Sequence, residues 1–195
     1  MLVGNRVRLR PVEETDLPLL VEWRNRPEVW ASFFNKFPLS SSGQRGWYKG
    51  LLEDRHRLLL MIEDRASREA IGTIGLDRID SISQVAEYGN VLIGAEKFRH
   101  QGLAREATLL LLAYGFDRLN LNRIFLHVLA DNPGAVQLYR QCGFREEGRL
   151  REAFFDQGAF KDILLFALLK ADYRSGVGNA KEASSGAPVV PGGVR

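Results

Sequence analysis

The stretch Arg99-His100-Gln101-Gly102-Leu103-Ala104 lies between a strand-like segment, residues 87–93, and a helical one, residues 104–119. A glycine turn that runs directly into a helix leaves backbone N–H groups without an intrahelical partner, and the helix dipole adds positive potential there. Such a turn can bind a phosphate. Two familiar nucleotide loops do not fit, because the sequence has no G-x-x-x-x-G-K-[ST] and Gly102 lacks the partner glycines of G-x-G-x-x-G. Taken alone, the six residues also fit a plain chain reversal.

The spacing of Arg99, Gly102 and Ala104 resembles the acetyl-CoA pyrophosphate loop of the GNAT superfamily of N-acetyltransferases, whose pattern is Arg/Gln-x-x-Gly-x-Gly/Ala. The resemblance continues downstream, where Asn132 stands at a helix start, Tyr139 follows seven residues later, and Gly143-Phe144 ends the helix. Residues 147–152, 155–158 and 161–162 are similar to the closing strands of one subgroup. That subgroup contains spermidine, ribosomal-protein and nucleotide-amino-sugar acetyltransferases. The likeness is strong over residues 87–170 and weaker over residues 7–79.

The resemblance implies one α/β (α+β) domain of GNAT type over residues 1–172. Its central sheet would be mixed and mostly antiparallel, with two splayed parallel central strands and flanking helices. Residues 173–195 are expected to form a flexible or disordered tail. From residue 175 onward the chain is rich in Gly, Ala, Ser, Pro and Val and has no aromatic residue, so it cannot bury enough surface to offset the entropy of ordering.

Hydrophobic periodicity predicts the elements of this domain. Gly143 is expected in a left-handed conformation at a helix end. Thr15 or Asp16 is expected to cap the first helix, and the aromatic segment with Trp30, Phe33, Phe34 and Phe37 to pack in the core or form a lid. The predicted strands are 6–10, 57–64, 70–79, 87–93, 123–129, 144–155 and 159–170, and the predicted helices run to about residue 24, over 42–53 and 104–119, and from Asn132 to Gly143.

The strand 87–93 is unusual because Gly89 and Asn90 interrupt its strand-forming residues, and a glycine inside a strand marks a bulge or a close backbone approach. The resemblance implies that this strand diverges from its parallel neighbour, and that the pantetheine of acetyl-CoA, the co-substrate, lies in the opening. The cofactor-binding residues implied in this way are Val91, Leu92, Ile93, Arg99, His100, Gln101, Gly102, Leu103, Ala104, Asn132, Ala135 and Tyr139.

Acetyl transfer to an amine makes three chemical demands. An amine with a pKa of about 10.4 is almost wholly protonated near neutrality, so a base has to assist. The developing oxyanion needs a donor, for which the backbone N–H near Leu92 is the candidate, and the departing thiolate needs a proton. The resemblance implies Glu87 as the base or water-orienting carboxylate and Tyr139 as the proton donor. Plainer interpretations are an ion-pair role for Glu87 and simple helix packing for Tyr139.

Composition limits the alternatives. The chain has 195 residues, of which 45% are hydrophobic and 26% charged, as in an ordinary globular protein. A net charge of +3 with interspersed Lys and Arg gives no basic face for nucleic acid. The longest apolar runs, 109–113 and 163–169, fall short of the roughly 18 residues of a membrane span, and residues 1–6 lack the core of a secretory signal. A cytoplasmic location is therefore expected.

A single cysteine, Cys142, and three scattered histidines give no metal-ligand spacing, so no metal is expected. Cys142 also has no His and Asp nearby in the sequence with which it could form a nucleophilic centre. Direct attack by the amine in a ternary complex is therefore favoured over a covalent acetyl-cysteine.

The acceptor is expected to be a small-molecule amine. Residues 22–29 and the pair Phe34-Asn35 resemble nucleotide-amino-sugar transferases, which favours a nucleotide-linked amino sugar. The alternatives are a polyamine, a protein N-terminus, an antibiotic amine, or a non-catalytic sensor that only binds acyl-CoA. The oligomeric state is left open, with a homodimer allowed. Charges in the expected acceptor wall are balanced, which argues against a polycation: they are Arg24, Arg26, Lys36, Arg45 and Lys49 beside Glu22, Glu28, Glu53 and Asp54.

Overall fold

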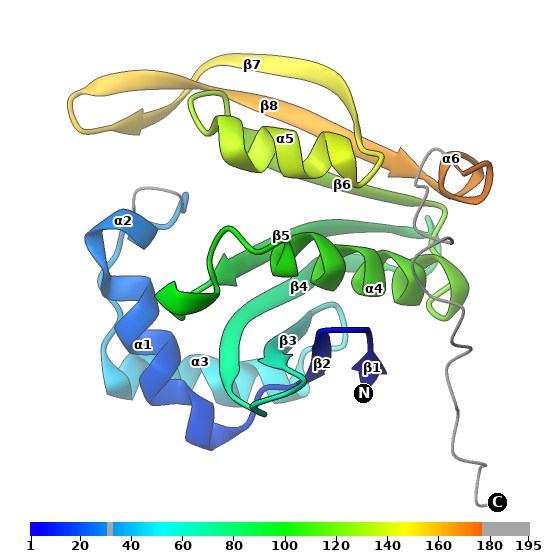
Figure 1. Cartoon of the computed structure of the whole chain (residues 1–195). Coiled ribbons are helices and arrows are strands. Elements are labelled where there is room, and N and C mark those ends of the chain that lie inside the picture. The colour runs from blue at the N-terminus through cyan, green and yellow to red at the C-terminus, as the bar shows by residue number, and fades with distance from the viewer. Residues whose placement is uncertain (31–32, 177–195) are drawn as a thin grey trace, which may run out of the picture.

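A computed structural model describes residues 1–30 and 33–176 of the chain. Its strands form one eight-stranded sheet in the order β1-β2-β3-β4-β5-β6-β8-β7 (Figure 1). The strands are β1 (Leu2–Val3), β2 (Val7–Pro11), β3 (Leu58–Asp64), β4 (Ala70–Asp80), β5 (Val85–Ile93), β6 (Arg123–Leu129), β7 (Arg145–Asp156) and β8 (Ala159–Leu169). The α-helices are α1 (Leu17–Asn25), α2 (Pro27–Trp30), α3 (Ser41–Glu53), α4 (Leu103–Asp117), α5 (Pro133–Gln141) and α6 (Lys170–Arg174), and two 3-10 turns are η1 (Glu14–Asp16) and η2 (Glu96–Phe98).

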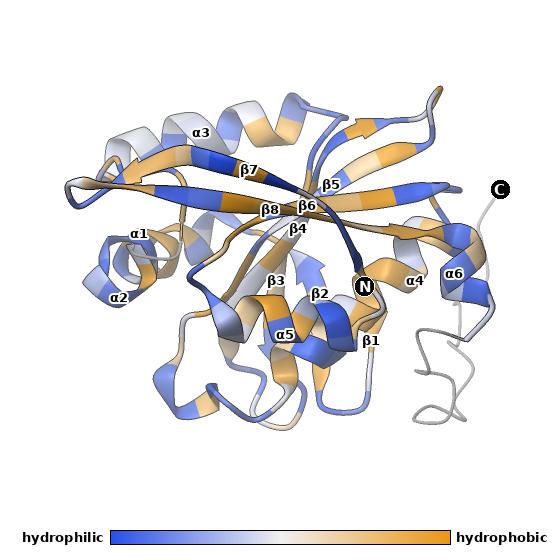
Figure 2. Ribbon diagram, turned by 90° about the horizontal axis from the view of Figure 1, so that it is seen from above, coloured by the Kyte–Doolittle hydropathy of each residue, from blue (hydrophilic) through white to orange (hydrophobic). Residues whose placement is uncertain are grey.

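Alternation of apolar residues along the strands lets the sheet bury both faces. On β3, Leu60 and Ile62 belong to the larger core, whereas Met61 between them belongs to a second core. Helices α4 and α5 cover the larger core, to which α4 contributes Phe116. Helices α1 and α3 cover the second core with Trp23 and Trp47. Figure 2 shows α3 and α5 on opposite sides of the sheet.

The sheet forks at β5 and β6, the one parallel pair among the strands of the described residues. The register joins Val85 to Arg123, Ala86 to Ile124 and Glu87 to Phe125, and it ends there. Beyond this point β5 continues along β4 and β6 continues along β8 as far as Leu129. The mixed sheet with diverging central strands is therefore confirmed, and α4 makes the connection between the two strands (Figure 1).

A bulge in β5 lies beside this fork. The register with β4 shifts between the pair Thr73–Leu92 and the pair Gly75–Gly89, and Asn90 has a left-handed φ of 55°. The hydroxyl of Thr73 donates to the carbonyl of Asn90 at 2.7 Å, and the Asn90 side chain donates to Asp77 Oδ2 at 2.6 Å. The predicted irregularity is thus present and centred on Asn90. The close approach of the two backbones is at Gly72 on β4 instead, where a Cβ atom would overlap the carbonyl oxygen of Leu92.

The predicted cap of the first helix is right in position only, because Asp16 is the N-cap residue of α1 but makes no side-chain cap hydrogen bond to that helix. Neither Thr15 nor Asp16 caps α1 through its side chain, and both lie in the turn η1. The Asp16 carboxylate is instead buried against Arg10, whose Nη1 and Nη2 donate to it at 2.7 and 2.8 Å. The same carboxylate also accepts from the Glu13 N–H at 2.9 Å, so it takes part in a local cap of η1 as well as in a bidentate ion pair with a neighbouring strand.

The C-terminal part of the described chain also differs from the expectation. Lys170 begins α6 instead of ending the last strand, and Tyr173 stacks on Phe116 with ring centroids 4.9 Å apart. Helix α6 therefore runs past residue 172, and most of the expected tail, residues 177–195, lies outside the described residues.

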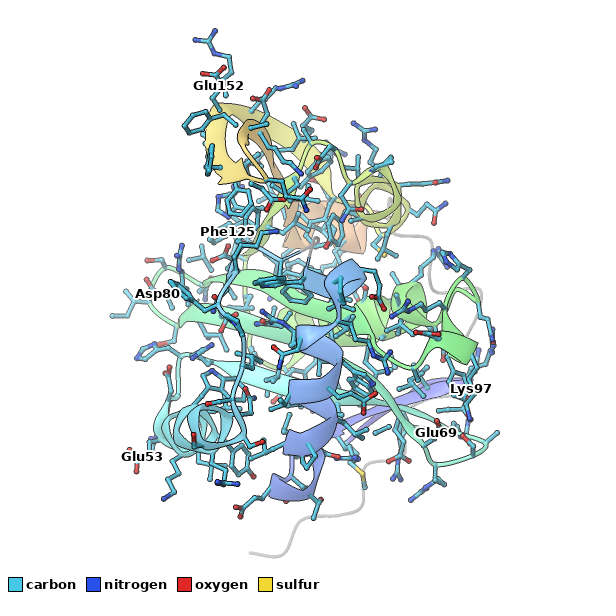
Figure 3. The ribbon with its side chains drawn as sticks, turned by 90° about the vertical axis from the view of Figure 1, so that its left-hand side faces the viewer. Glu53, Glu69, Asp80, Lys97, Phe125 and Glu152 are labelled. Atoms are coloured by element: carbon cyan, nitrogen blue, oxygen red, sulfur yellow. The ribbon has the colours of Figure 1, made fainter. Side chains whose placement is uncertain are left out.

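Figure 3 shows Glu69 close to Lys97, and a 2.6 Å ion pair joins the β3–β4 hairpin to η2 there. Within the described part of the chain, no helix is long and apolar enough to span a membrane.

Candidate active site

A cavity of about 1020 Å³ occupies the fork between β5 and β6. It brings together most of the residues that the sequence predicted. Those that line it are Glu87, Val91, Leu92, Ile93, Arg99, His100, Ala104, Asn132, Ala135 and Tyr139.

Three predicted residues do not line the cavity with their side chains. Leu103 is only 1% exposed and belongs to the core, so its backbone N–H is all that it can offer. The Gln101 side chain accepts from Arg6 Nη2 at 2.9 Å and donates to the Lys97 carbonyl at 2.6 Å. Gly102 has no side chain, and its contribution is conformational.

The turn that leads into α4 has the geometry of an anion site. Gly102 is the N-cap residue with a left-handed φ of 78°, and no side chain caps the helix. Glycine adopts this conformation without the steric cost of a Cβ. The first N–H groups of α4 therefore remain available beside the cavity-lining residues Arg99 and Ala104.

Arg99 is held at this turn and keeps a free donor. Its Nε donates to the Ile93 carbonyl at 3.1 Å, which fixes the side chain against β5. Its Nη2 is buried without a hydrogen bond among the described residues and lies 3.6 Å from Glu28 Oε1. A buried guanidinium donor beside a free helix N-terminus fits a phosphate oxygen.

Glu87 contacts a residue that sequence reasoning missed. Its Oε1 lies 2.8 Å from His127 Nδ1 across the fork, and its Oε2 lies 3.3 Å from Arg78. Both Glu87 and His127 line the cavity. A carboxylate partner favours a proton on Nδ1, which leaves Nε2 able to accept a proton. The sequence did contain a signal for His127. It alternates with the buried residues Ile124, Leu126 and Val128 along the strand, so its side chain had to face away from that core.

Tyr139 packs in an aromatic cluster, and its hydroxyl has no hydrogen-bond partner among the described residues. The side chain is 6% exposed, and its ring meets the Tyr88 ring edge-to-face with centroids 5.7 Å apart. The Tyr88 hydroxyl is 2.7 Å from the Thr108 hydroxyl, whereas Tyr139 has no such partner among the described residues. Burial raises the pKa of Tyr139 above its ordinary value, so the phenol stays protonated. It can donate a proton to a group bound in the cavity.

Cys142 is buried beside this cluster, and its thiol is a poor nucleophile. The residue is 1% exposed, and burial raises the pKa of its thiol to about 11. A thiol that stays protonated is a poor nucleophile. This agrees with the expectation of direct transfer. Among the residues that the structure describes, there is also no cluster of His, Cys, Asp and Glu that could hold a metal ion.

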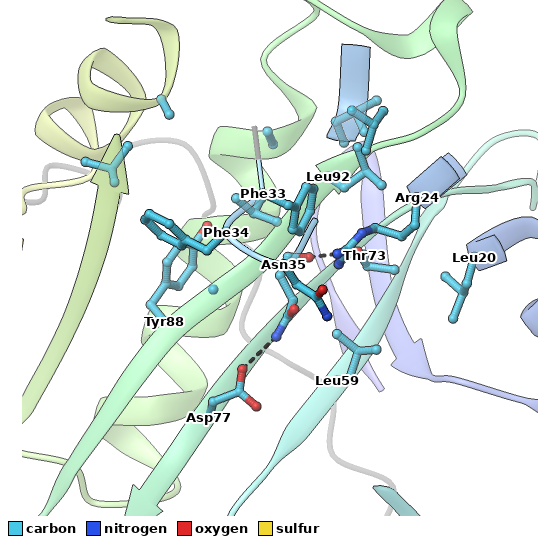
Figure 4. A pocket seen from close by; sticks show the side chains of 18 of the residues that line it. Leu20, Arg24, Phe33, Phe34, Asn35, Leu59, Thr73, Asp77, Tyr88 and Leu92 are labelled. Atoms are coloured by element: carbon cyan, nitrogen blue, oxygen red, sulfur yellow. Dashed lines mark hydrogen bonds between the residues drawn. The ribbon is translucent and has the colours of Figure 1, made fainter. Parts of the chain in front are cut away.

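The far wall of the cavity comes from the segment between α1 and α3. Phe33 and Phe34 of the predicted aromatic segment line it, whereas Phe37 is 80% exposed and lies outside it. Asn35, Gln44 and other neutral residues add hydrogen-bonding groups to this wall. Figure 4 shows Arg24, Phe33, Phe34, Asn35 and Leu92 around this part of the cavity.

Comparisons with known proteins agree with this geometry. Residues 6–145 match the family described as the acetyltransferase (GNAT) domain. The chain is 33% identical over 173 residues to a spermidine N(1)-acetyltransferase of Vibrio cholerae serotype O1, which covers 88% of this chain and 97% of that protein. The crystal structure of spermidine N-acetyltransferase from Vibrio cholerae in complex with CoA and spermine matches with a TM-score of 0.82 and 32% identity, covering 88% of this chain and 99% of that one. A dodecameric structure of that enzyme in an intermediate state matches with a TM-score of 0.75 and 32% identity, covering 87% and 97% of the two chains.

Proposed function

The chain belongs to the GNAT family of acetyltransferases, and from this premise we propose that it transfers the acetyl group of acetyl-CoA directly to the primary amine of a small molecule. The observation that carries the proposal is the convergence of Glu87, His127 and Tyr139 on one cavity at the fork of the sheet. A protein that only binds acyl-CoA would need the loop and the fork but not these three side chains.

The residues present fit acetyl-CoA. The backbone of β5 beyond Glu87 has no partner strand on the β6 side, so its polar groups remain for the amides of pantetheine. At the end of this track, Arg99 and the N-terminus of α4 offer free donors for the pyrophosphate. When bound, acetyl-CoA supplies an activated acetyl thioester.

Side chains of this protein can then accept and donate the protons that acetyl transfer requires. We assign the Glu87–His127 pair to removing a proton from the acceptor's amine, with His127 Nε2 as the accepting atom and Glu87 holding the ring. We assign the Tyr139 hydroxyl to giving a proton to the departing thiolate. The Leu92 backbone N–H, fixed by the bulge at Asn90, is assigned to the acetyl oxygen.

Among acceptor classes, a polyamine has the support of the comparisons, because the relatives described above are named for spermidine. None of those relatives is named for a nucleotide-linked amino sugar, the acceptor that the sequence favoured. Spermidine is therefore the first acceptor to test. Assembly of several copies is likewise supported by the dodecameric relative, and light scattering of the purified chain would measure it.

The decisive experiment combines binding with turnover. Calorimetry measures binding of acetyl-CoA, and a thiol-release assay then measures transfer to spermidine, putrescine, amino sugars and a peptide with a free N-terminus. Release of CoA together with an acetylated product supports the proposal. Tight binding without transfer to any amine would instead make the chain a sensor of acyl-CoA, and no binding would refute both functions.

A further inference from the structure

Arg24 places a positive charge in the acceptor half of the cavity, and no carboxylate among the described residues pairs with it. The side chain comes from α1, and its guanidinium carbon lies 3.7 Å from the centroid of the Phe33 ring. Figure 4 shows the two side chains next to each other at the cavity wall. The Nε atom is buried without a hydrogen bond, and Arg24 forms no ion pair with any residue that the structure describes.

The carboxylates that line the cavity are already engaged by other groups. The pairs are Asp77 with Arg57 at 2.8 Å, Glu28 with Arg99 at 3.6 Å, and Glu87 with His127 at 2.8 Å. The lining therefore carries no surplus of negative charge that would attract a second ammonium group. Burial also lowers the pKa of Arg24, which reflects a charge removed from water without compensation.

The chain segment that follows Glu28 supplies no further acid to act as the missing partner. Between Glu28 and Glu53 the chain contains no Asp or Glu, whereas it contains Lys36, Arg45 and Lys49. Contact with the face of Phe33 offsets part of the cost of burying the guanidinium. It leaves the buried Nε–H unsatisfied, however, because a ring face does not replace a hydrogen-bonding anion.

We infer that Arg24 binds an acidic group of the acceptor, so that this chain acetylates amines that also carry a carboxylate or a phosphate. The inference rests on the proposed transfer of acetyl to a small primary amine, and it names a different acceptor class from the polyamines of the relatives. A polyamine would bring its second ammonium toward the unbalanced guanidinium. An anion would accept from the buried Nε–H and give the guanidinium a charged partner in a site partly shielded from water.

Three amines of nearly equal shape test the inference: 4-aminobutyrate, butylamine and putrescine carry a negative, a neutral and a positive far end. We expect kcat/KM for 4-aminobutyrate to exceed that for the other two by at least about tenfold, since a charge-assisted hydrogen bond is lost with them. Comparing O-phosphoethanolamine with ethanolamine then separates phosphate from carboxylate.

Variants assign the preference to Arg24. Arg24→Gln should abolish it by raising KM for the acidic amine, Arg24→Lys should retain part of it, and Arg24→Glu should reverse it toward putrescine. Arg45→Gln is the matched control, because Arg45 is exposed on α3 and does not line the cavity. Thermal unfolding of each variant checks that it is folded.

Several outcomes would overturn the inference. Equal or better turnover of butylamine or putrescine would show that no acidic group is bound. An equal fall in kcat for all acceptors in Arg24→Gln would place Arg24 at the acetyl group, and a change only in KM for acetyl-CoA would place it at the cofactor. Transfer to spermidine but to none of these amines would overturn the inference alone. Acetyl-CoA binding without transfer to these amines or to the panel described under the proposed function would refute both.

Discussion

Glu87 Oε1 lies 2.8 Å from His127 Nδ1, and the two residues come from parallel strands that separate directly after Glu87. The fork that admits a ligand and the pair that can take up a proton are therefore built from the same residues. The carboxylate fixes the orientation of the imidazole ring at the wall of the cavity. We therefore expect the two side chains to act together as one base.

If Glu87 and His127 act together, their substitutions should have non-additive effects on kcat. Glu87→Gln should lower kcat by about 100-fold, because general-base catalysis contributes about 100-fold to 10,000-fold. His127→Gln should lower kcat by a similar factor, and the double variant should be no slower than the slower single variant. Steady-state kinetics at saturating acetyl-CoA checks this, with the 74% exposed Arg78 as the control in Arg78→Gln. A kcat loss in the double variant equal to the product of the two single losses would mean that the two residues act independently.

Tyr139→Phe should lower kcat by about 100-fold and leave the Kd for acetyl-CoA nearly unchanged, because only the proton donor is removed. Tyr88→Phe is a matched control from the same aromatic cluster. It loses the hydrogen bond to Thr108, so it should lower the free energy of unfolding by about 1 kcal/mol with a much smaller effect on kcat. Kinetics and calorimetry separate the two effects. A loss confined to acetyl-CoA binding would show that the Tyr139 hydroxyl does not act in transfer.

Gly102→Val should weaken acetyl-CoA binding by at least about tenfold, since a β-branched residue is strained at a φ of 78° and distorts the turn into α4. A Cβ at this position meets nothing within 4 Å, so the effect comes from backbone conformation. Gly102→Asn is the control, because Asn tolerates the left-handed region better than other side chains. Calorimetry with acetyl-CoA measures both variants. Unchanged affinity in Gly102→Val would remove the turn from the site.

Asp16 should contribute stability that is lost in acid. Burial alone would raise the pKa of its carboxyl, but hydrogen bonds from Arg10 and the Glu13 N–H outweigh burial and lower it below the ordinary 3.8. Because the folded pKa lies below the unfolded one, the stabilisation is complete above the unfolded value and disappears as the pH falls through the folded value. Asp16→Asn should therefore be less stable than the wild type near neutrality, with a gap that narrows in acid.

Urea unfolding from about pH 7 to about pH 3 measures that gap. Glu53→Gln is the control, because Glu53 is an exposed residue at the end of α3 with no ion pair in the described structure. A stability gap for Asp16→Asn that stays constant over this range would mean that the carboxylate's charge does not contribute.

Periodicity predicted the long elements well. The strand 123–129 matches β6, and the helix 104–119 and strand 57–64 match α4 and β3 to within two residues. These segments are long enough for burial of one face to show as a repeating pattern. The two-residue β1, the four-residue α2 and the five-residue α6 were missed, because elements that short have no period to detect.

The site was predicted only where a local motif was present. The turn at Gly102 and the strand at Asn90 have local signatures, and both lie at the cavity. The pairing of Glu87 with His127 depends on the register of two strands far apart in the sequence, and the lack of a partner for Arg24 depends on the whole cavity wall. Asp16 shows the same limit, since its ion pair with Arg10 on β2 depends on tertiary packing that the local sequence does not show.

The short parallel contact between β5 and β6 gives the sheet two edges inside the molecule. Unpaired strand edges on a protein surface attract strands of other chains and can start aggregation. Here the edges beyond Glu87 and Phe125 border a cavity of about 1020 Å³ with α4 and α5 on one side. Because these edges border a cavity rather than the outer surface, their unpaired N–H and C=O groups can bind a ligand inside the molecule.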